Sequence, residues 1–245
     1  MGGRCGGFAW LRDQSFLFWT ACRTLMSGRL NLRSTPVFSI QQKQRSIASL
    51  HDSFHLLEPD HAVLEVSSKS PDSLGVELSA FNLRIHHPGY GEYSVESAFQ
   101  ASKVFLRGGP FADLFEVSNR ESKSDPRLKD SGQLIGFRFF SRDFPLEPKT
   151  YFYDWLYASA LIRKPDLLSA VVKYDAFTDI EFNPNKSINC QARSVAKAVG
   201  LWRQNLLAQA LSSPEIFLEI GYGQKGSDSG VPRKPEGVQV QDFLF

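Results

Sequence analysis

The sequence predicts a helix-dominated α+β fold, a single domain of helices with a few short strands. Residues 190–211 carry apolar side chains at a nearly helical period, and residues 151–163 form a second helical stretch. Residues 62–66 form a β-like run, so strands and helices are mixed along the chain. Neither a repeat period nor a GxGxxG or P-loop string occurs, so the nucleotide-binding folds that these strings mark have no support.

The first half of the domain alternates short elements with loops. The β-like run at 62–66 is followed by a loop at 67–72 and a second short segment at 74–83. A helix is expected over 93–105, and the Gly-Gly-Pro string that follows must end it, because both residue types are poor in helix interiors. The other elements expected here are a short helix at 111–115 and a charged loop or helix at 120–129.

Helices dominate the second half of the domain, and their ends carry the usual boundary residues. A proline ends one helix and can begin the next, and a Ser-Pro pair begins the last. The expected elements are a helix at 151–163 capped by Thr150, a helix from Pro165 to Tyr174, the long helix at 190–211 and a final turn at 213–220.

The two ends of the chain differ in composition from the middle. Residues 1–35 hold five arginines and a single acid, Asp13, and their apolar patch at 16–19 is too short to span a bilayer. Such a segment is either a transit peptide or an irregular, poorly ordered extension, and we favour the extension. Residues 223–245 are rich in Gly, Ser, Pro and charge, which predicts a flexible tail and leaves residues 36–222 as the folded domain.

The composition limits the partners and the compartment. The 245 residues carry a net charge of +2, which gives no overall signature of polyanion binding. Cys5, Cys22 and Cys190 are scattered and odd in number, which argues against a disulfide framework and fits a reducing, cytoplasmic location. Because CxxC, HExxH and histidine-cluster motifs are missing from the sequence, we expect no structural zinc. The short apolar patch at 16–19 leads us to expect no membrane association.

An acid, an amide and an amine share one face of the helix expected over 93–105. Glu96, Gln100 and Lys103 fall at i, i+4 and i+7, which are neighbouring positions on a helix. In one interpretation the three side chains line a polar pocket. In the other they form a solvated face, on which Glu96 is favoured by the positive end of the helix. Spacing alone favours the solvated face.

A second group of polar residues occupies 174–193, between two predicted helices. Long loops that alternate aromatic and polar residues, as at Asp175, Phe177 and Asp179, often line ligand sites. Such residues equally satisfy turns and cap the next helix, for which Asn189 is a good candidate. The residues alone do not separate these two interpretations.

Two further candidates carry weaker signals. The loop from Ser67 to Pro71, with Lys69 inside it, could hold a phosphate, although serine-rich loops are usually only loops. Cys190 could be a nucleophile at the start of a helix, although a small buried cysteine is the commoner case. The five histidines have no motif context, so no nucleophilic triad can be assembled.

Three segments, at 78–81, 94–103 and 175–193, together resemble the NADAR family, also known as YbiA-like, which processes ADP-ribose. Longer strings resemble one branch of it, the NADAR antitoxins that accompany DarT-type toxins. The resemblance covers roughly residues 36–220, and ordered strings of this length are specific. The strings are QKQRSIASLH, LEVSSKSPDSLGVELSAFNL, ESAFQASKVFLRGGPFADLF, DPRLKDSGQLIGFRFF, PLEPKTYFYDWLYASAL and YDAFTDIEFNPNKSINCQARS.

The resemblance implies a single YbiA-like domain and a hydrolase of N-glycosyl bonds. The enzyme would remove ADP-ribose from guanine in DNA and so act as the antitoxin to a DarT-type toxin. Glu96 matches the catalytic glutamate of the family, and Gln100 and Lys103 match the same motif and would line the site. The other residues expected to bind substrate are Asp175, Phe177, Asp179, Asn189, Ser67, Lys69 and Ser79.

This chemistry suits the residue types. A carboxylate beside the anomeric carbon stabilises an oxocarbenium-like state and can activate water. Asp175 or Asp179 could serve as a separate acid near the leaving group. Lys103 could bind the diphosphate or keep Glu96 ionised. The reaction requires no metal, and we expect no cofactor.

Two other functions remain open at this point. One is hydrolysis of a small ADP-ribose or riboflavin-pathway N-glycoside, because the wider family is linked to such compounds. The other is a protein without catalytic activity that neutralises a toxin by contact. If the substrate is DNA, we expect Lys43 and Arg45 to grip its phosphate backbone.

Overall fold

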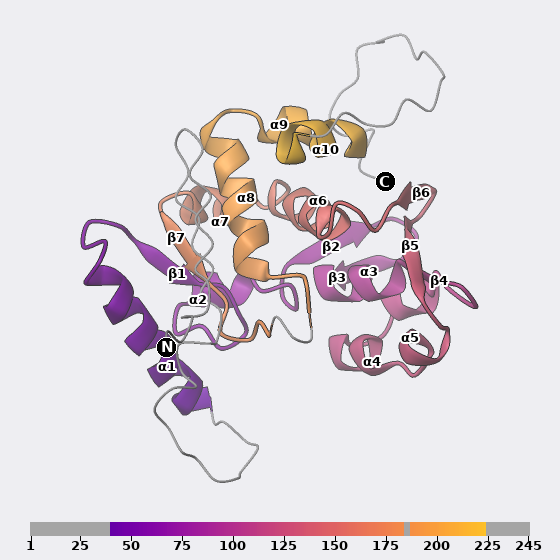
Figure 1. Cartoon of the computed structure of the whole chain (residues 1–245), viewed down its shortest axis with the longest axis horizontal. Coiled ribbons are helices and arrows are strands. Elements are labelled where there is room, and N and C mark those ends of the chain that lie inside the picture. The colour runs from indigo at the N-terminus through magenta and orange to yellow at the C-terminus, as the bar shows by residue number, and fades with distance from the viewer. Residues whose placement is uncertain (1–39, 184–186, 224–245) are drawn as a thin grey trace, which may run out of the picture.

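The structure is a computed structural model that describes residues 40–183 and 187–223. The predicted extension at 1–35 and the tail from residue 224 onward lie outside these ranges. Figure 1 shows how the helices and strands are arranged. In chain order they are α1 (Ile40–His55), β1 (Val63–Glu65), α2 (Ser73–Glu77), β2 (Arg84–His87), β3 (Gly91–Ser94), α3 (Val95–Ala101), β4 (Lys103–Phe105), η2 (Ala112–Phe115), α4 (Asn119–Ser124), α5 (Arg127–Asp130), β5 (Leu134–Phe139), β6 (Arg142–Phe144), α6 (Tyr151–Leu161), α7 (Pro165–Val171), β7 (Ala176–Thr178), α8 (Gln191–Arg203), α9 (Leu207–Ala210) and α10 (Pro214–Tyr222).

Helix α6 lies at the centre of the fold (Figure 1). All of its residues are buried, and it packs against α3, α7, α8 and α10. Its sequence, YFYDWLYASAL, is apolar around almost the whole circumference, which is the pattern of a helix enclosed by other elements. Phe152 and Trp155 contact the rings of Phe139 and Phe144 from β5 and β6. The predicted helix-dominated α+β class is confirmed.

The strands form small sheets around this helix. Strand β1 pairs in parallel with β7, β2 and β3 form an antiparallel hairpin, and β4, β5 and β6 form an antiparallel sheet. Strand β7 was not predicted, because residues 174–193 read as a loop. Its pairing with β1, with Val63 opposite Ala176, joins segments that lie far apart in the sequence. Local pattern does not reveal a strand of three residues whose partner is so distant.

The prediction of one helix over 93–105 is wrong. Residues 93 and 94 end β3, α3 covers Val95–Ala101, and β4 begins at Lys103. The hydroxyl of Ser102 donates to the carbonyl oxygen of Ala98 where the helix ends. Gly109 then adopts a φ of +82°, and a Cβ there would lie 2.1 Å from the carbonyl oxygen of Lys103. The turn at Gly109 follows β4, which pairs with β5 in an antiparallel arrangement.

Other helices match the prediction more closely. Helix α10 begins after Ser213, whose hydroxyl accepts from the N–H of Ile216, as the Ser-Pro pair suggested. The long helix predicted at 190–211 is interrupted, because Asn205 adopts a φ of +59° between α8 and α9. Helix α1 was not predicted. Its main helical signal is that Ile47 and Phe54 lie on the same, buried face.

Candidate active site

Glu96 lies in the first turn of α3 and is 7% exposed. One turn later, Gln100 donates from Nε2 to Glu96 Oε1 at 2.9 Å. Gln100 is 6% exposed, and its carbonyl oxygen has no hydrogen-bond partner among the described residues. A buried unpaired acceptor beside a buried carboxylate is the arrangement expected where a ligand completes the hydrogen bonding. The pocket interpretation of the helix face is therefore favoured over the solvated one.

Two lysines approach Glu96 from different elements. Lys103 belongs to β4, and its ammonium lies 5.0 Å from the centre of the Phe99 ring. Burial lowers the pKa of Lys103, while the nearby Glu96 carboxylate acts to raise it. Lys123 belongs to α4, and its Nζ lies 3.8 Å from Glu96 Oε1. Lys103 is thus near Glu96 as predicted, but a strand places it there.

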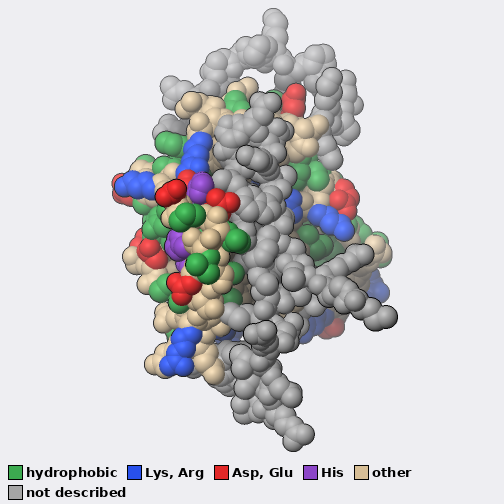
Figure 2. All heavy atoms as spheres, turned by 60° about the vertical axis from the view of Figure 1, so that its left-hand side comes forward, with side chains coloured by type: hydrophobic (Ala, Val, Ile, Leu, Met, Phe, Trp, Pro, Cys, Tyr) green, Lys and Arg blue, Asp and Glu red, His purple; other side chains and the backbone are tan. Residues whose placement is uncertain are grey.

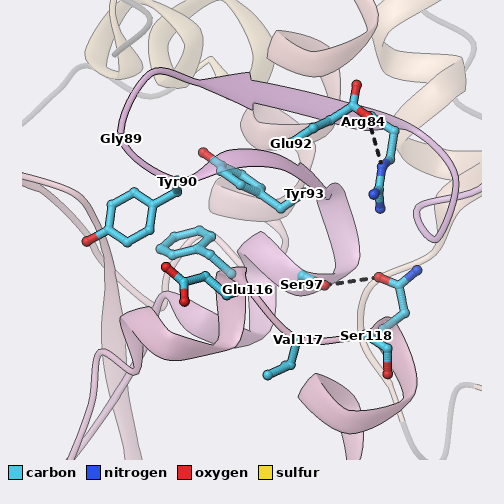
Figure 3. Close-up of a pocket in the computed structure, with 11 residues that line it drawn as sticks. Arg84, Gly89, Tyr90, Glu92, Tyr93, Ser97, Glu116, Val117 and Ser118 are labelled. Carbon is cyan, nitrogen blue, oxygen red and sulfur yellow. Dashed lines mark hydrogen bonds and ion pairs between the residues drawn. The ribbon is translucent and has the colours of Figure 1, made fainter.

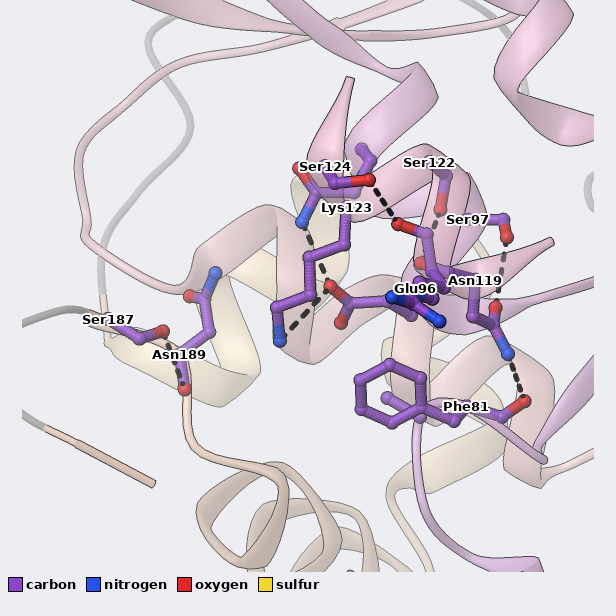
Figure 4. A network of polar contacts seen from close by, with 12 residues as sticks. Phe81, Glu96, Ser97, Asn119, Ser122, Lys123, Ser124, Ser187 and Asn189 are labelled. Atoms are coloured by element: carbon purple, nitrogen blue, oxygen red, sulfur yellow. Dashed lines mark hydrogen bonds and ion pairs between the residues drawn. The ribbon is translucent and has the colours of Figure 1, made fainter. Parts of the chain in front are cut away.

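Asn119, the first residue of α4, ties this helix to α3. Its Oδ1 accepts from the hydroxyl of Ser97 at 3.0 Å and also from that of Ser94. Its Nδ2 donates to the carbonyl oxygen of Phe81 at 2.8 Å. Figure 4 shows how these bonds set Lys123, one turn further along α4, beside the buried carboxylate.

A pocket of about 440 Å³ lies next to this ion pair. Its wall consists of the Phe81 ring and one side of α4, so the pocket combines an aromatic surface with basic side chains. The residues that line it are Phe81, Asn119, Arg120, Lys123 and Ser124.

A second pocket, of about 600 Å³, lies between the β2–β3 hairpin and the segment from η2 to α4 (Figure 3). Asn119 lines both pockets. The acids in the second pocket, Glu92 and Glu116, are exposed, and Glu92 pairs with Arg84 at 3.7 Å. Because Lys123, which lines the first pocket, pairs with the buried Glu96 carboxylate, we place the candidate active site there.

Asp179 is 3% exposed and caps α8. Its Oδ2 accepts from the N–H of Gln191 at 3.1 Å, and its Oδ1 accepts from the N–H of Glu181 at 3.1 Å. Gln191 in turn accepts through Oε1 from the N–H of Ala80 at 2.6 Å. Asp179, rather than the predicted Asn189, therefore supplies the cap. The clamp fixes the start of α8 against the segment before β2.

Glu65 is a second buried carboxyl group, in β1. It accepts from Thr178 Oγ1 at 2.5 Å and from the N–H of Ile180 at 2.8 Å. His51 of α1 bonds the same threonine hydroxyl at 3.0 Å. Burial raises the pKa of Glu65 and lowers that of His51 to about 4. These groups fasten α1 to the β1–β7 pair.

Asp175 and Phe177, two of the residues expected to bind substrate, have partners within the framework, and their role in substrate binding stays a prediction. Asp175 accepts from the N–H of Ala62 at 3.1 Å and pairs with Arg203 at 3.1 Å. Phe177 is 2% exposed and belongs to the core. The physical reason is that both belong to the β7 region, where pairing with β1 turns the expected ligand loop into buried sheet.

Ser67, Lys69 and Ser79 also have local partners. The hydroxyl of Ser67 accepts from the N–H of Lys69 at 3.2 Å, and that of Ser79 donates to the carbonyl oxygen of Val76 at 2.8 Å. Both serines are fully buried. Their hydroxyls thus close turns rather than form an open phosphate cradle, and a role in substrate binding stays a prediction.

Asn189 lies in the loop before α8, where its carbonyl oxygen accepts from the hydroxyl of Ser187 at 3.1 Å. Figure 4 draws both residues on the side of Lys123 away from Phe81.

The two residues of α1 that are expected to contact DNA differ in their surroundings. Lys43 forms an ion pair with Glu181, whereas Arg45 is exposed. Figure 2 shows acidic, basic and hydrophobic side chains intermingled on the visible coloured part of the surface. A grip on the phosphate backbone by these two residues stays a prediction.

Cys190 is buried, and burial raises the pKa of its thiol. This favours the structural interpretation of the cysteine over the nucleophilic one. Within residues 40–183 and 187–223, no cluster of three or more His, Cys, Asp or Glu residues could hold a metal ion. In the same ranges no helix has the length and apolar character that a membrane crossing needs.

Four residues at or near the site were not singled out from the sequence. Phe81 falls in a string that carried the resemblance, so that string was its signal. Lys123 lies in the stretch at 120–129 that was predicted only as a charged loop or helix, and Asn119 directly precedes that stretch. Gln191 was a helix residue without a distinguishing pattern. Their roles depend on contacts between elements, which local periodicity does not encode.

The buried Asp179 gives a testable pH dependence. Burial, and then the charge of Glu65, raises the pKa of Asp179 from 3.8 to about 7. Between these values the folded protein holds a proton that the unfolded chain has lost, so this residue makes the free energy of unfolding fall as the pH rises. In the wild type, this residue should lower the free energy of unfolding by roughly 1 kcal/mol per pH unit between pH 4 and 7. We expect Asp179→Asn to abolish that contribution, which urea unfolding across this pH range would measure.

His51 provides a control of opposite sign. Its pKa is lowered from 6.5 to about 4, so the unfolded chain binds the extra proton and this residue makes stability rise with pH in that window. His51→Gln should therefore make the free energy of unfolding fall more steeply as the pH rises. Asp179→Asn should make it fall less steeply. Equal pH slopes for the wild type and Asp179→Asn would contradict the assignment of Asp179.

Comparison with family models gives a match over residues 17–230 to NADAR-DarT1, described as the DarT1-associated NADAR antitoxin. The match covers most of the chain and includes every residue of the candidate site. A search of curated proteins found no match.

Proposed function

Because this chain belongs to the DarT1-associated NADAR antitoxin family, we propose that it hydrolyses the N-glycosidic bond between ADP-ribose and guanine in DNA. Such a reaction would reverse the modification that a DNA-directed toxin makes. The observation that carries the proposal is the buried Glu96 carboxylate with the unpaired Gln100 carbonyl oxygen beside it.

The surroundings of Glu96 support a role in hydrolysis of an N-glycosidic bond. As the C–N bond breaks, positive charge develops on the ribose ring, and a nearby carboxylate stabilises it. Water then adds its oxygen to the anomeric carbon and gives one proton to Glu96. That proton ends on the nitrogen of the departing base, which regenerates the carboxylate. The hydrogen bond from Gln100 holds the carboxylate in one orientation.

The unpaired oxygen of Gln100 would accept a hydroxyl of the ribose. That bond would satisfy a buried acceptor, whose desolvation otherwise costs about 1 to 3 kcal/mol. Lys103 is partly buried near Glu96, and burial lowers the pKa of its ammonium. Arg120 is exposed at the pocket wall, where its guanidinium would bind the diphosphate.

The test is release of ADP-ribose from a guanine-modified oligonucleotide by the purified protein. Free ADP-ribose N-glycosides should be poorer substrates, since they lack the DNA. Turnover of the small compounds alone would replace this proposal with a metabolite hydrolase. No turnover of either, together with a stable complex with the toxin, would replace it with neutralisation by contact.

A further inference from the structure

The segment that carries Phe81 is fixed at several backbone atoms. The N–H of Ala80 donates to Gln191, and the carbonyl oxygen of Ala80 accepts from the N–H of Glu96 at 2.9 Å. The carbonyl oxygen of Phe81 accepts from Asn119 at 2.8 Å. The position of the aromatic ring is therefore coupled directly to the backbone of the proposed catalytic glutamate.

The ring of Phe81 is only partly buried, although most aromatic rings nearby belong to the core. It lines the pocket, and the ammonium of Lys123 lies 5.0 Å from its centre. The same ammonium lies 3.8 Å from Glu96 Oε1. A flat aromatic surface, a hydrogen-bond donor and the carboxylate thus meet at one point, as Figure 4 shows.

We propose that Phe81 and Lys123 form the subsite for the base that the reaction releases. This inference rests on the proposed function. The bond to be broken lies between the base and the ribose carbon that Glu96 faces, so the base must occupy the space next to Glu96. The adenine of ADP-ribose is separated from that carbon by the diphosphate and a second sugar. Phe81 stacks on the released base, as aromatic side chains do on unstacked bases.

Lys123 gives this subsite a preference for guanine. Guanine presents two acceptors, O6 and N7, on the edge where adenine presents an amino group next to N7. The Lys123 ammonium can donate to O6 and N7 of guanine. In adenine it meets the amino group, which is itself a donor. On binding, Lys123 would exchange its contact with the Phe81 ring for a hydrogen bond to O6, and its charge would stabilise electron density on the leaving base.

The first experiment measures the affinity of ADP-ribosylated oligonucleotide for the Glu96→Gln variant, with and without Phe81→Leu. Leucine keeps an apolar side chain but removes the flat ring. We expect the affinity to fall about 5- to 150-fold, the range that loss of one base–aromatic stack gives. Phe81→Trp, which keeps an aromatic face, should retain most of the affinity.

Free ADP-ribose is the matched control ligand, because it has no base at the anomeric carbon. Its affinity should not change in Phe81→Leu. An equal loss for both ligands would overturn the proposal, since it would assign the ring to adenine or to the fold. Unchanged affinity for the modified oligonucleotide would also overturn it.

The second experiment compares kcat/KM on guanine-modified and adenine-modified oligonucleotides. Lys123→Met should lower the guanine-to-adenine ratio about tenfold, and Lys129→Met, which removes an exposed charge on α5, should leave the ratio unchanged. An unchanged ratio in Lys123→Met would reject the guanine preference. If the wild type releases no ADP-ribose at all, the proposed function fails; if it does and these variants behave like it, only the subsite fails.

Discussion

Glu96→Gln is expected to slow the release of ADP-ribose from modified DNA by about 10²- to 10⁴-fold, the range for loss of a positioned catalytic carboxylate. Glutamine has nearly the same shape and can keep an acceptor for the Gln100 amide. It carries no negative charge and cannot take a proton from water. Single-turnover kinetics on a guanine-modified oligonucleotide would measure the effect on the chemical step.

Glu219→Gln is the matched control for this substitution. Glu219 is an exposed helical residue on α10, away from the pocket, and it undergoes the same change of charge and shape. It should retain the wild-type rate. Both variants should unfold at the wild-type urea midpoint or close to it. A Glu96→Gln protein that is folded and fully active would remove the physical basis of the proposed function.

Asp154→Ala is expected to lower the free energy of unfolding by about 3 to 5 kcal/mol, the range for breaking a buried ion pair on one side. Asp154 is 1% exposed and lies in α6, at the centre of the fold. It accepts from Ser194 at 2.6 Å, from Tyr222 at 2.6 Å and from Thr150 at 3.0 Å. Lys197 Nζ lies 3.4 Å from the same carboxylate.

The large effect arises because the partners would stay buried without the carboxylate. Burial already lowers the pKa of Lys197 to about 8, and Asp154 is the group that opposes this shift. Urea unfolding monitored by circular dichroism would measure the loss. Asp143→Ala, which breaks an exposed ion pair with Arg138, should move the midpoint very little.

A double variant separates the stranded charge from the lost hydrogen bonds. In Asp154→Ala/Lys197→Met the buried cation is absent, so part of the stability should return. If the double variant is as unstable as the two single losses added together, the ion pair is not the origin of the effect. If Asp154→Ala is as stable as the wild type, the carboxylate does not link α6 to α8 and α10 as the contacts indicate.

The helices were predicted best where their signals are local. Helices α7 and α10 begin close to the predicted positions, because Pro165, Pro214 and Ser213 act within one turn. Helix α6 also begins where predicted, but the expected cap was wrong: Thr150 has a left-handed φ of +71°, and its side chain makes no capping hydrogen bond. The break at Asn205 was missed, since an asparagine in the left-handed region leaves no mark in the apolar pattern. Strand β7 was missed because its three residues form a strand only through their distant partner in β1.

The sequence by itself determined the helix-dominated α+β class, the family resemblance and the Glu96–Gln100 pair, whose four-residue spacing puts both side chains on one face of α3. Tertiary structure decided the rest of the site. It brought Lys103 from β4, Lys123 from α4 and the Phe81 ring to that pair, and it moved Asp175 and Phe177 into the framework. The physical reason is that periodicity records which face of an element is apolar, whereas the elements that meet there are selected by packing and by hydrogen bonds between distant residues.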